Sequence, residues 1–78
     1  MLKTTDYFRF TRQRPARAQI RLEWILITVW APEAEAVQPD GRIRRWRYIK
    51  DEERFLRVVL LADGETVHNA FFDRRFTP

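Results

Sequence analysis

The stretch Arg54-Phe-Leu-Arg-Val-Val-Leu-Leu-Ala-Asp-Gly-Glu-Thr-Val-His-Asn-Ala-Phe-Phe72 decides the fold of this chain. It contains two runs rich in β-branched and aromatic residues on either side of Asp63-Gly64, a dipeptide that favours a two-residue hairpin turn. We therefore predict two antiparallel strands, over residues 54–61 and 65–72. Because successive side chains of a strand point to opposite faces, the turn also predicts which residues share a face.

A register that pairs Ala62 with Glu65 divides this hairpin into an apolar face and a mixed face. The apolar face is expected to form the core, with the pairs Leu60–Val67, Val58–Asn69 and Leu56–Phe71. The mixed face then carries the pairs Val59–His68, Arg57–Ala70 and Phe55–Phe72. Arg74 continues the same alternation, so His68, Arg57 and Arg74 are predicted to lie on one surface.

The residues before this hairpin predict two helices and more of the same sheet. Thr4, Thr5 or Asp6 can cap a first short helix, which Pro15 ends or interrupts. Residues 20–31 fit both helical and strand spacing, and we assign a helix because Ala-Pro-Glu follows. Further on we expect a weak strand at residues 34–37, a turn at Pro39-Asp40-Gly41 and a strand over residues 42–50.

These elements predict a single α+β domain over residues 1–78, with two N-terminal helices packed on one face of a three- to four-stranded antiparallel sheet. One feature of the sheet stays open. An even loop around Asp51-Glu52 would place Arg44, Trp46 and Tyr48 on the His68 face, whereas an odd loop would place Arg45 and Arg47 there.

The charged residues favour an anionic partner. Among 78 residues with a net charge of +4, the basic ones comprise 13 Arg and 2 Lys, and the guanidinium group binds phosphate in a forked geometry that an ammonium group lacks. The chain contains no cysteine and only one histidine, so we expect neither a metal site nor a cofactor. Its longest apolar stretch, residues 24–31, is well short of the ~20 residues that span a bilayer, and no secretory signal is recognisable, so we expect a cytoplasmic protein.

Several segments resemble a family of small bacterial proteins related to the RelE- and BrnT-like toxins of toxin–antitoxin modules. The segments are Thr-Asp-Tyr-Phe, Leu-Glu-Trp-Ile, Ala-Pro-Glu, Asp-Gly-Arg-Ile-Arg, Leu-Arg-Val-Val and the closing Val-His-Asn-Ala-Phe-Phe-Asp-Arg-Arg-Phe. The resemblance implies a compact α+β fold, metal-independent cleavage of RNA, with or without the ribosome, and neutralisation by an acidic antitoxin protein. Many members of that family carry a histidine where this chain has Tyr7 or Phe8.

The chemistry of RNA cleavage gives the candidate residues their expected roles. A histidine near its ordinary pKa suits proton transfer to or from ribose oxygens, which points to His68. Fixed guanidinium groups suit the charge of a pentacovalent phosphorus, which points to Arg57 and Arg74, and Tyr48 is an auxiliary candidate. Basic and aromatic residues that bind the RNA backbone and stack on its bases are expected at Arg42, Arg44, Arg45, Trp46, Arg47 and Arg75.

Each of these residues also has a purely structural interpretation. His68 is equally compatible with a half-buried strand histidine, Arg57 with an ion pair to Asp73 or Glu65, and Trp46 with the core. A non-catalytic module that binds RNA or an acidic protein is the alternative function, and a structural subunit whose apolar face is completed in a complex is a third. The sequence leaves the oligomeric state open.

Overall fold

The computed structural model describes residues 2–78 and consists, over those residues, of three short α-helices and one four-stranded antiparallel sheet. The helices are α1 (Asp6–Thr11), α2 (Pro15–Ala18) and α3 (Leu22–Trp30). The strands are β1 (Ala34–Val37), β2 (Ile43–Ile49), β3 (Arg54–Leu60) and β4 (Val67–Phe72), and they are hydrogen-bonded in the order β1-β2-β3-β4. The predicted α+β class is confirmed.

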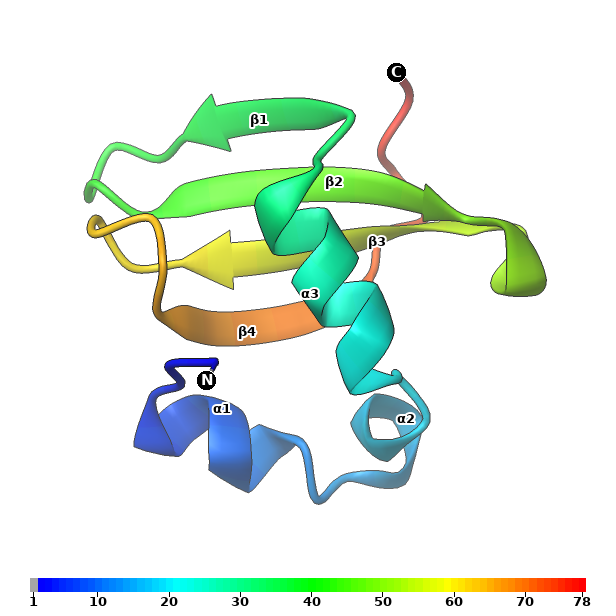
Figure 1. Ribbon diagram of the computed structural model, residues 1–78, viewed down its shortest axis with the longest axis horizontal. Coiled ribbons are helices and arrows are strands. Elements are labelled where there is room, and N and C mark those ends of the chain that lie inside the picture. The colour runs from blue at the N-terminus through cyan, green and yellow to red at the C-terminus, as the bar shows by residue number, and fades with distance from the viewer. Residues whose placement is uncertain (1) are drawn as a thin grey trace.

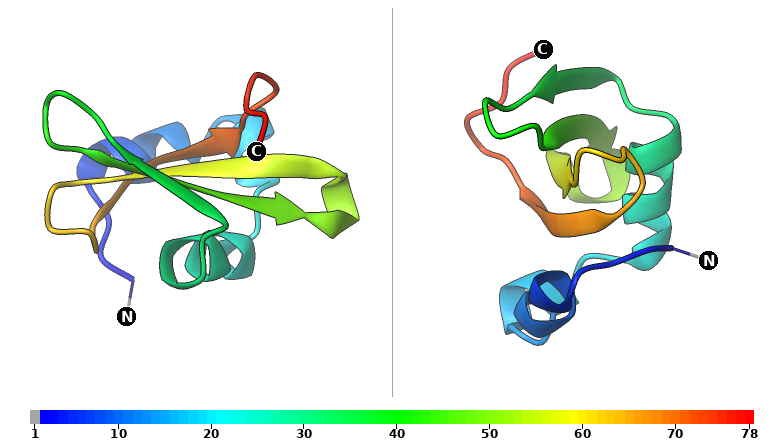
Figure 2. Two further views of the ribbon diagram at one scale, coloured as in Figure 1. Left: turned by 90° about the horizontal axis from the view of Figure 1, so that it is seen from above. Right: turned by 90° about the vertical axis from the view of Figure 1, so that its left-hand side faces the viewer.

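Only one of the helices covers a face of the sheet. Helix α3 crosses β2 and β3, whereas α1 and α2 lie beyond the β4 edge (Figure 1). The expectation of two helices on one face therefore holds for α3 alone. The side view shows the other face of the sheet without a helix (Figure 2, right). We call this second side of the sheet the open face.

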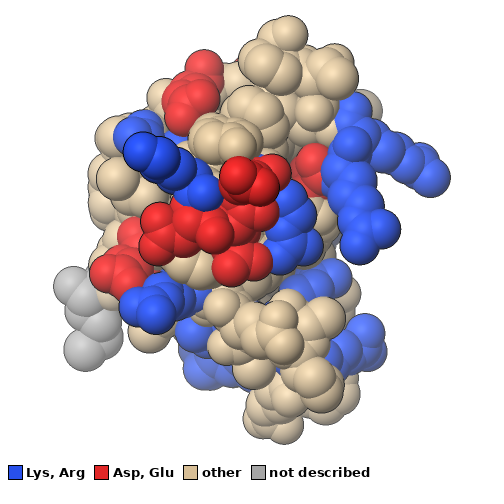
Figure 3. All heavy atoms as spheres, turned by 90° about the vertical axis from the view of Figure 1, so that its right-hand side faces the viewer, with Lys and Arg blue, Asp and Glu red and all other residues tan. Residues whose placement is uncertain are grey.

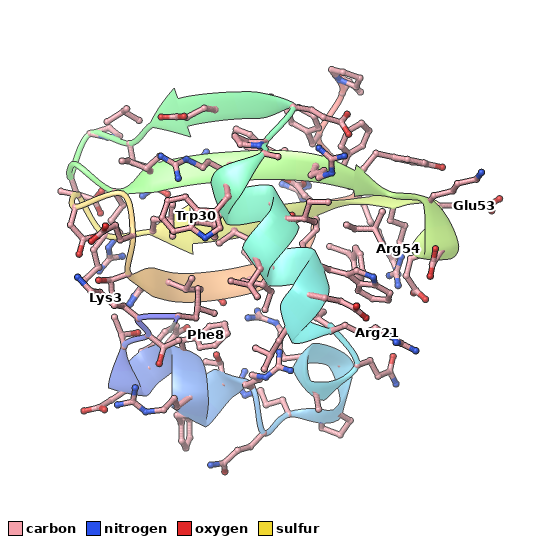
Figure 4. All side chains as sticks on the ribbon, viewed as in Figure 1. Lys3, Phe8, Arg21, Trp30, Glu53 and Arg54 are labelled. Atoms are coloured by element: carbon pink, nitrogen blue, oxygen red, sulfur yellow. The ribbon has the colours of Figure 1, made fainter. Side chains whose placement is uncertain are left out.

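The start of α1 is tied to β4 by both backbone and side-chain contacts. Thr5 caps the helix, since its hydroxyl accepts a hydrogen bond from the Phe8 backbone nitrogen at 3.1 Å. The Thr5 backbone nitrogen in turn donates to the Val67 carbonyl at 3.0 Å. Phe8 then reaches from α1 toward β4 and is buried (Figure 4).

Pro15 begins α2 rather than ending a longer helix, as its missing N–H allows at a first helical position.

The core lies between α3 and the sheet face that it covers. Leu56, Val58, Leu60 and Val67 are all fully buried, as the hairpin register predicted. They pack with residues of the helices and of the other strands, including Phe8, Ile20, Ile25, Val29, Ile49 and Ala70.

The hairpin register departs from the prediction at one residue. Leu60 pairs with Val67 as expected, but Val59 pairs with Asn69, Val58 with Ala70 and Leu56 with Phe72. His68 is therefore the extra residue of a β-bulge and has no pairing partner on β3. The predicted pairs beyond His68 are wrong because the bulge shifts β4 by one position. As a result Phe72 packs against the core, and Phe71, which we expected there, lies on the open face beside Arg57.

The loop between β2 and β3 has an even number of residues, which settles the face on which the β2 side chains lie. It contains four residues, a 3-10 turn at Lys50–Glu52 followed by Glu53 with a φ of 53°, so that Ile49 pairs with Arg54 and Trp46 with Arg57. The even loop places Arg44, Trp46 and Tyr48 on the face of Arg57. Figure 3 views the end of the molecule where this acidic loop lies and shows Asp and Glu side chains gathered there between groups of basic ones.

Candidate functional site

A hollow of about 440 Å³ on the open face brings His68 together with three arginines. Its basic walls are Arg42, which directly precedes β2, Arg44 near the start of β2 and Arg57 in the middle of β3. His68 and Asn69 enter from β4, and the remaining walls include Tyr7, Gln38, Val59 and Phe71. The predicted proximity of His68 and Arg57 is thus present, although the bulge rather than a regular ladder aims the imidazole.

The imidazole of His68 is held by two residues at the start of α1. Its Nδ1 atom lies 3.1 Å from the Thr5 hydroxyl, and the Tyr7 ring stacks on it at 4.8 Å between ring centres. Because Nδ1 is engaged, Nε2 is the nitrogen that is available to a ligand. Burial, followed by the positive charge of Arg42, lowers the pKa of His68 below its usual 6.5, against a weaker opposing influence from Asp40. His68 is therefore neutral near pH 7.

Arg57 is fixed by an ion pair and an aromatic ring. Its Nε atom lies 3.4 Å from Asp73 Oδ2, and its guanidinium carbon lies 4.5 Å from the centre of the Phe71 ring. Burial lowers the pKa of Arg57, while Asp73 acts in the opposite direction, and the group stays charged at neutral pH. The Arg17 guanidinium also lies 5.2 Å from the Phe71 ring centre and donates to the Asn69 side chain. Such contacts reduce the freedom of both guanidinium groups before any ligand arrives.

The other two arginines of the hollow, Arg42 and Arg44, are held less tightly. Arg44 Nε donates to the Gln38 side chain at 2.8 Å, and Arg42 lies 3.8 Å from Asp40. Arg44 thus keeps its terminal nitrogens for other partners. Arg44 pairs with Val59 and Arg57 pairs with Trp46, so the two arginines are diagonal neighbours on the same face of β2 and β3. Together they place two cations in the hollow.

A second hollow, of about 430 Å³, adjoins the first on the open face. Arg44 and Arg57 line both of them. Its other walls are Trp46 from β2 and three residues that follow β4, Asp73, Arg75 and Phe76. Two of the predicted RNA-binding residues, Trp46 and Arg75, therefore lie next to the His68 hollow rather than within it.

The remaining candidate residues lie outside both hollows. Tyr48 is on the open face, where it packs edge-to-face against Phe55 at 5.3 Å, and Arg74 lies exposed in the turn after β4. Arg45 and Arg47 point to the α3 face. They donate to carbonyls at the end of α3, Arg45 to Val29 at 2.8 Å and Arg47 to Ala31 at 2.6 Å. Those carbonyls have no partner within the helix, so these two arginines close its C-terminus.

Sequence reasoning missed Tyr7, Gln38 and Asn69 as walls of the His68 hollow. The position of Tyr7 follows from the cap at Thr5 and the pairing of the N-terminal segment with Val67, which local spacing does not reveal. Asn69 was assigned to the core face, and the bulge moves it to the open face.

No group of three or more potential metal-ligating side chains occurs within residues 2–78. Over the same residues, no helix is both long enough and apolar enough to cross a bilayer. The chain matches no protein-family model, no curated protein and no solved structure. The resemblance to RelE- and BrnT-like toxins therefore stays a prediction.

Proposed function

We propose that the protein is a metal-independent endoribonuclease of the toxin class, which acts in the cytoplasm and is neutralised by an acidic antitoxin. One observation carries the proposal: a neutral imidazole with a free Nε2 lies in the same hollow as Arg42, Arg44 and Arg57. Cleavage of RNA without a metal requires a proton acceptor near the ribose and fixed cations near the phosphate.

In the proposed reaction, the ribose 2′-oxygen attacks the adjacent phosphorus and its proton passes to Nε2 of His68. The bond from phosphorus to the 5′-oxygen breaks and this oxygen takes up a proton from water, which leaves a 2′,3′-cyclic phosphate on one product and a 5′-hydroxyl on the other. His68 then releases its proton to the solvent. This role requires Nδ1 to carry the proton of the neutral ring and to donate a hydrogen bond to the Thr5 hydroxyl. The Thr5 hydroxyl has a free lone pair for that bond, beside the one that accepts from Phe8.

Arg57 and Arg44 are assigned to the phosphate because both line the hollow from the centre of the sheet. They stabilise the charge that develops on the non-bridging oxygens. Tyr7 replaces Tyr48 as the auxiliary residue, since its ring stacks on His68 and it is one of the two positions, Tyr7 and Phe8, where the resembled family often has a histidine. A phenol can donate a hydrogen bond to the departing oxygen. Arg74, which is exposed outside the hollow, is left out of the mechanism.

The second candidate function is a binding module that holds RNA or an acidic protein without cleaving RNA. The existing contacts of Arg57 and His68 favour this function, because Asp73 already pairs with Arg57 and the Thr5 hydroxyl already contacts His68. The same hollow would serve as a static anion site.

A 2′-deoxy substitution separates the two functions. The wild-type protein, assayed in the presence of a chelator, should cut a single-stranded oligoribonucleotide to products with 2′,3′-cyclic phosphate ends. The same oligonucleotide with deoxyribose at the cut sites should bind but stay intact, and His68→Gln should bind RNA and fail to cut it. Binding of RNA by the wild type without any cleavage, with or without ribosomes, would establish the binding module instead.

A further inference from the structure

The chain reverses direction after β4, and its next residues fold onto the open face. The Asp73 backbone nitrogen still donates to the Phe55 carbonyl at 2.9 Å, as a continuation of β4. Asp73 Oδ1 then accepts from the Arg75 backbone nitrogen at 3.1 Å, which closes a turn. We call residues 73–76 the C-terminal segment. Its course across the end of the sheet is visible as the red trace in Figure 2.

The first contact of this segment is made by a carboxylate. Asp73 Oδ2 accepts from the Trp46 indole nitrogen at 3.0 Å and lies 3.4 Å from Arg57 Nε. The Asp73 side chain is only 12% exposed. Burial opposes its ionisation, but the hydrogen bonds from Trp46 and from the Arg75 backbone, followed by the charge of Arg57, together lower its pKa. A full negative charge therefore lies against Arg57.

The second contact is made by a flat ring. Phe76 stacks on Trp46 with 4.6 Å between ring centres and 14° between ring planes, and Phe55 meets the edge of Phe76 at 4.9 Å. Trp46 points to the open face and has no helix above it, yet it is only 7% exposed. The C-terminal segment is what covers it.

A negative group on an arginine and a flat ring stacked on a tryptophan are the two contacts that a nucleotide of single-stranded RNA makes with a protein. We propose that Trp46, Arg57 and Arg44 form a nucleotide subsite and that the C-terminal segment occupies this subsite in the free protein. Asp73 stands in place of a phosphate and Phe76 in place of a base. The subsite adjoins the His68 hollow through the two shared arginines, Arg44 and Arg57, and its assignment to RNA rests on the proposed function.

An RNA strand that enters the subsite must displace these contacts, so the C-terminal segment weakens RNA binding. Loss of the stack should strengthen binding by about 3- to 10-fold, the equivalent of one aromatic pair. Loss of the Asp73 charge should strengthen it as well, because Arg57 then has no competing anion. The two gains differ in what they require of the ligand: the first needs a base, and the second needs only a phosphate.

Two probes and four variants test the subsite. The probes are a fluorescent single-stranded oligouridylate and inorganic polyphosphate, which has the charge but no bases. Phe76→Ala should bind the oligouridylate more tightly and polyphosphate unchanged. Asp73→Asn, which keeps one acceptor oxygen for the Trp46 indole, should bind both more tightly than Asp51→Asn, the same charge change in the exposed β2–β3 loop. The gain from Asp73→Asn should vanish when Arg57→Ala is added.

The outcomes separate the subsite from the proposed function. If the wild type binds oligouridylate and Phe76→Ala binds it no better, the subsite is wrong while the His68 site stands. If neither the wild type nor any variant binds it, both are wrong. Melting curves establish that each variant folds, and Phe76→Leu, which keeps apolar cover without a flat ring, replaces Phe76→Ala if the latter unfolds.

Discussion

The Thr5 hydroxyl lies 3.1 Å from the Phe8 backbone nitrogen and also 3.1 Å from His68 Nδ1. One oxygen therefore begins α1 and orients the only histidine of the chain. The bond spans residues that are far apart in sequence and joins the edge of the sheet to the first helix. Its consequences for stability and for the imidazole can be measured separately.

Loss of the Thr5 hydroxyl should destabilise the protein and loosen His68. Thr5→Ala removes the helix cap, which is worth about 0.5–2 kcal/mol in the free energy of unfolding. Urea denaturation measures that loss, and NMR of the imidazole should show a changed chemical environment. Thr5→Ser keeps a hydroxyl and serves as the control, with most of the stability and the wild-type imidazole signals. Equal losses for the two variants would show that the methyl group, not the hydroxyl, matters here.

The stability of the protein should depend on pH through His68. The pKa of His68 is lower in the folded state than its usual 6.5, so the unfolded chain binds the proton more tightly. The free energy of unfolding should therefore fall as the pH drops below about 6.5, until the folded-state imidazole is also protonated. His68→Gln should remove this part of the pH dependence between about pH 8 and pH 5. An NMR titration midpoint at or above 6.5 in the free protein would contradict the lowered pKa.

Arg57 and Arg74 should differ in their effects on RNA, although the sequence predicts both on one face of the sheet. Arg57 lines both hollows and Arg74 lies in an exposed turn. Arg57→Ala should reduce the salt dependence of RNA affinity by about 0.7 log units per log unit of salt, the value for one phosphate contact on a single strand. It should also slow cleavage by about 10²- to 10³-fold.

Arg74→Ala is the matched control for that measurement, and it should leave the cleavage rate within a fewfold of wild type. Melting curves must accompany both variants, because removal of Arg57 leaves the buried Asp73 without its cation. Equal losses of cleavage for folded Arg57→Ala and Arg74→Ala would show that the hollow is not the reactive site.

Arg45 should contribute to stability rather than to RNA affinity. Its NH1 group donates to the Val29 and Gly64 carbonyls at 2.8 and 3.2 Å, and its side chain is 16% exposed. Arg45→Met keeps the apolar stem but leaves those carbonyls unsatisfied, which should cost about 1.5–3 kcal/mol in the free energy of unfolding. Arg44→Met, on the opposite face of the same strand, should do the reverse and weaken RNA binding with a small effect on stability. A large loss of RNA affinity in folded Arg45→Met would place RNA on the helix face.

Local sequence patterns were enough to predict the α+β class of the fold and the position of most elements. The alternation in residues 54–61 and the apolar run before Pro32 are local patterns, and the structure has a strand and a helix at those places. A turn is also present at Asp63-Gly64, but it is wider than the predicted two-residue turn, since β3 ends at Leu60, β4 begins at Val67 and the Leu61 nitrogen donates to the Thr66 carbonyl at 2.9 Å. The burial of Leu56, Val58, Leu60 and Val67 followed from the same alternation, because side chains near the turn inherit its register. His68 and Arg57 could thus be expected near each other.

The face that each remaining candidate residue occupies depends on contacts between residues that are distant in the sequence. The bulge at His68 moves Phe71 and Asn69 across the sheet, and it lies next to Val67, whose carbonyl accepts from the Thr5 backbone nitrogen. The parity of the β2–β3 loop depends on Glu53, a residue with no turn preference, in a left-handed conformation. The fold-back of Asp73 and Phe76 onto Trp46 joins residues 27 and 30 positions apart, and such contacts depend on packing that strand periodicity does not encode.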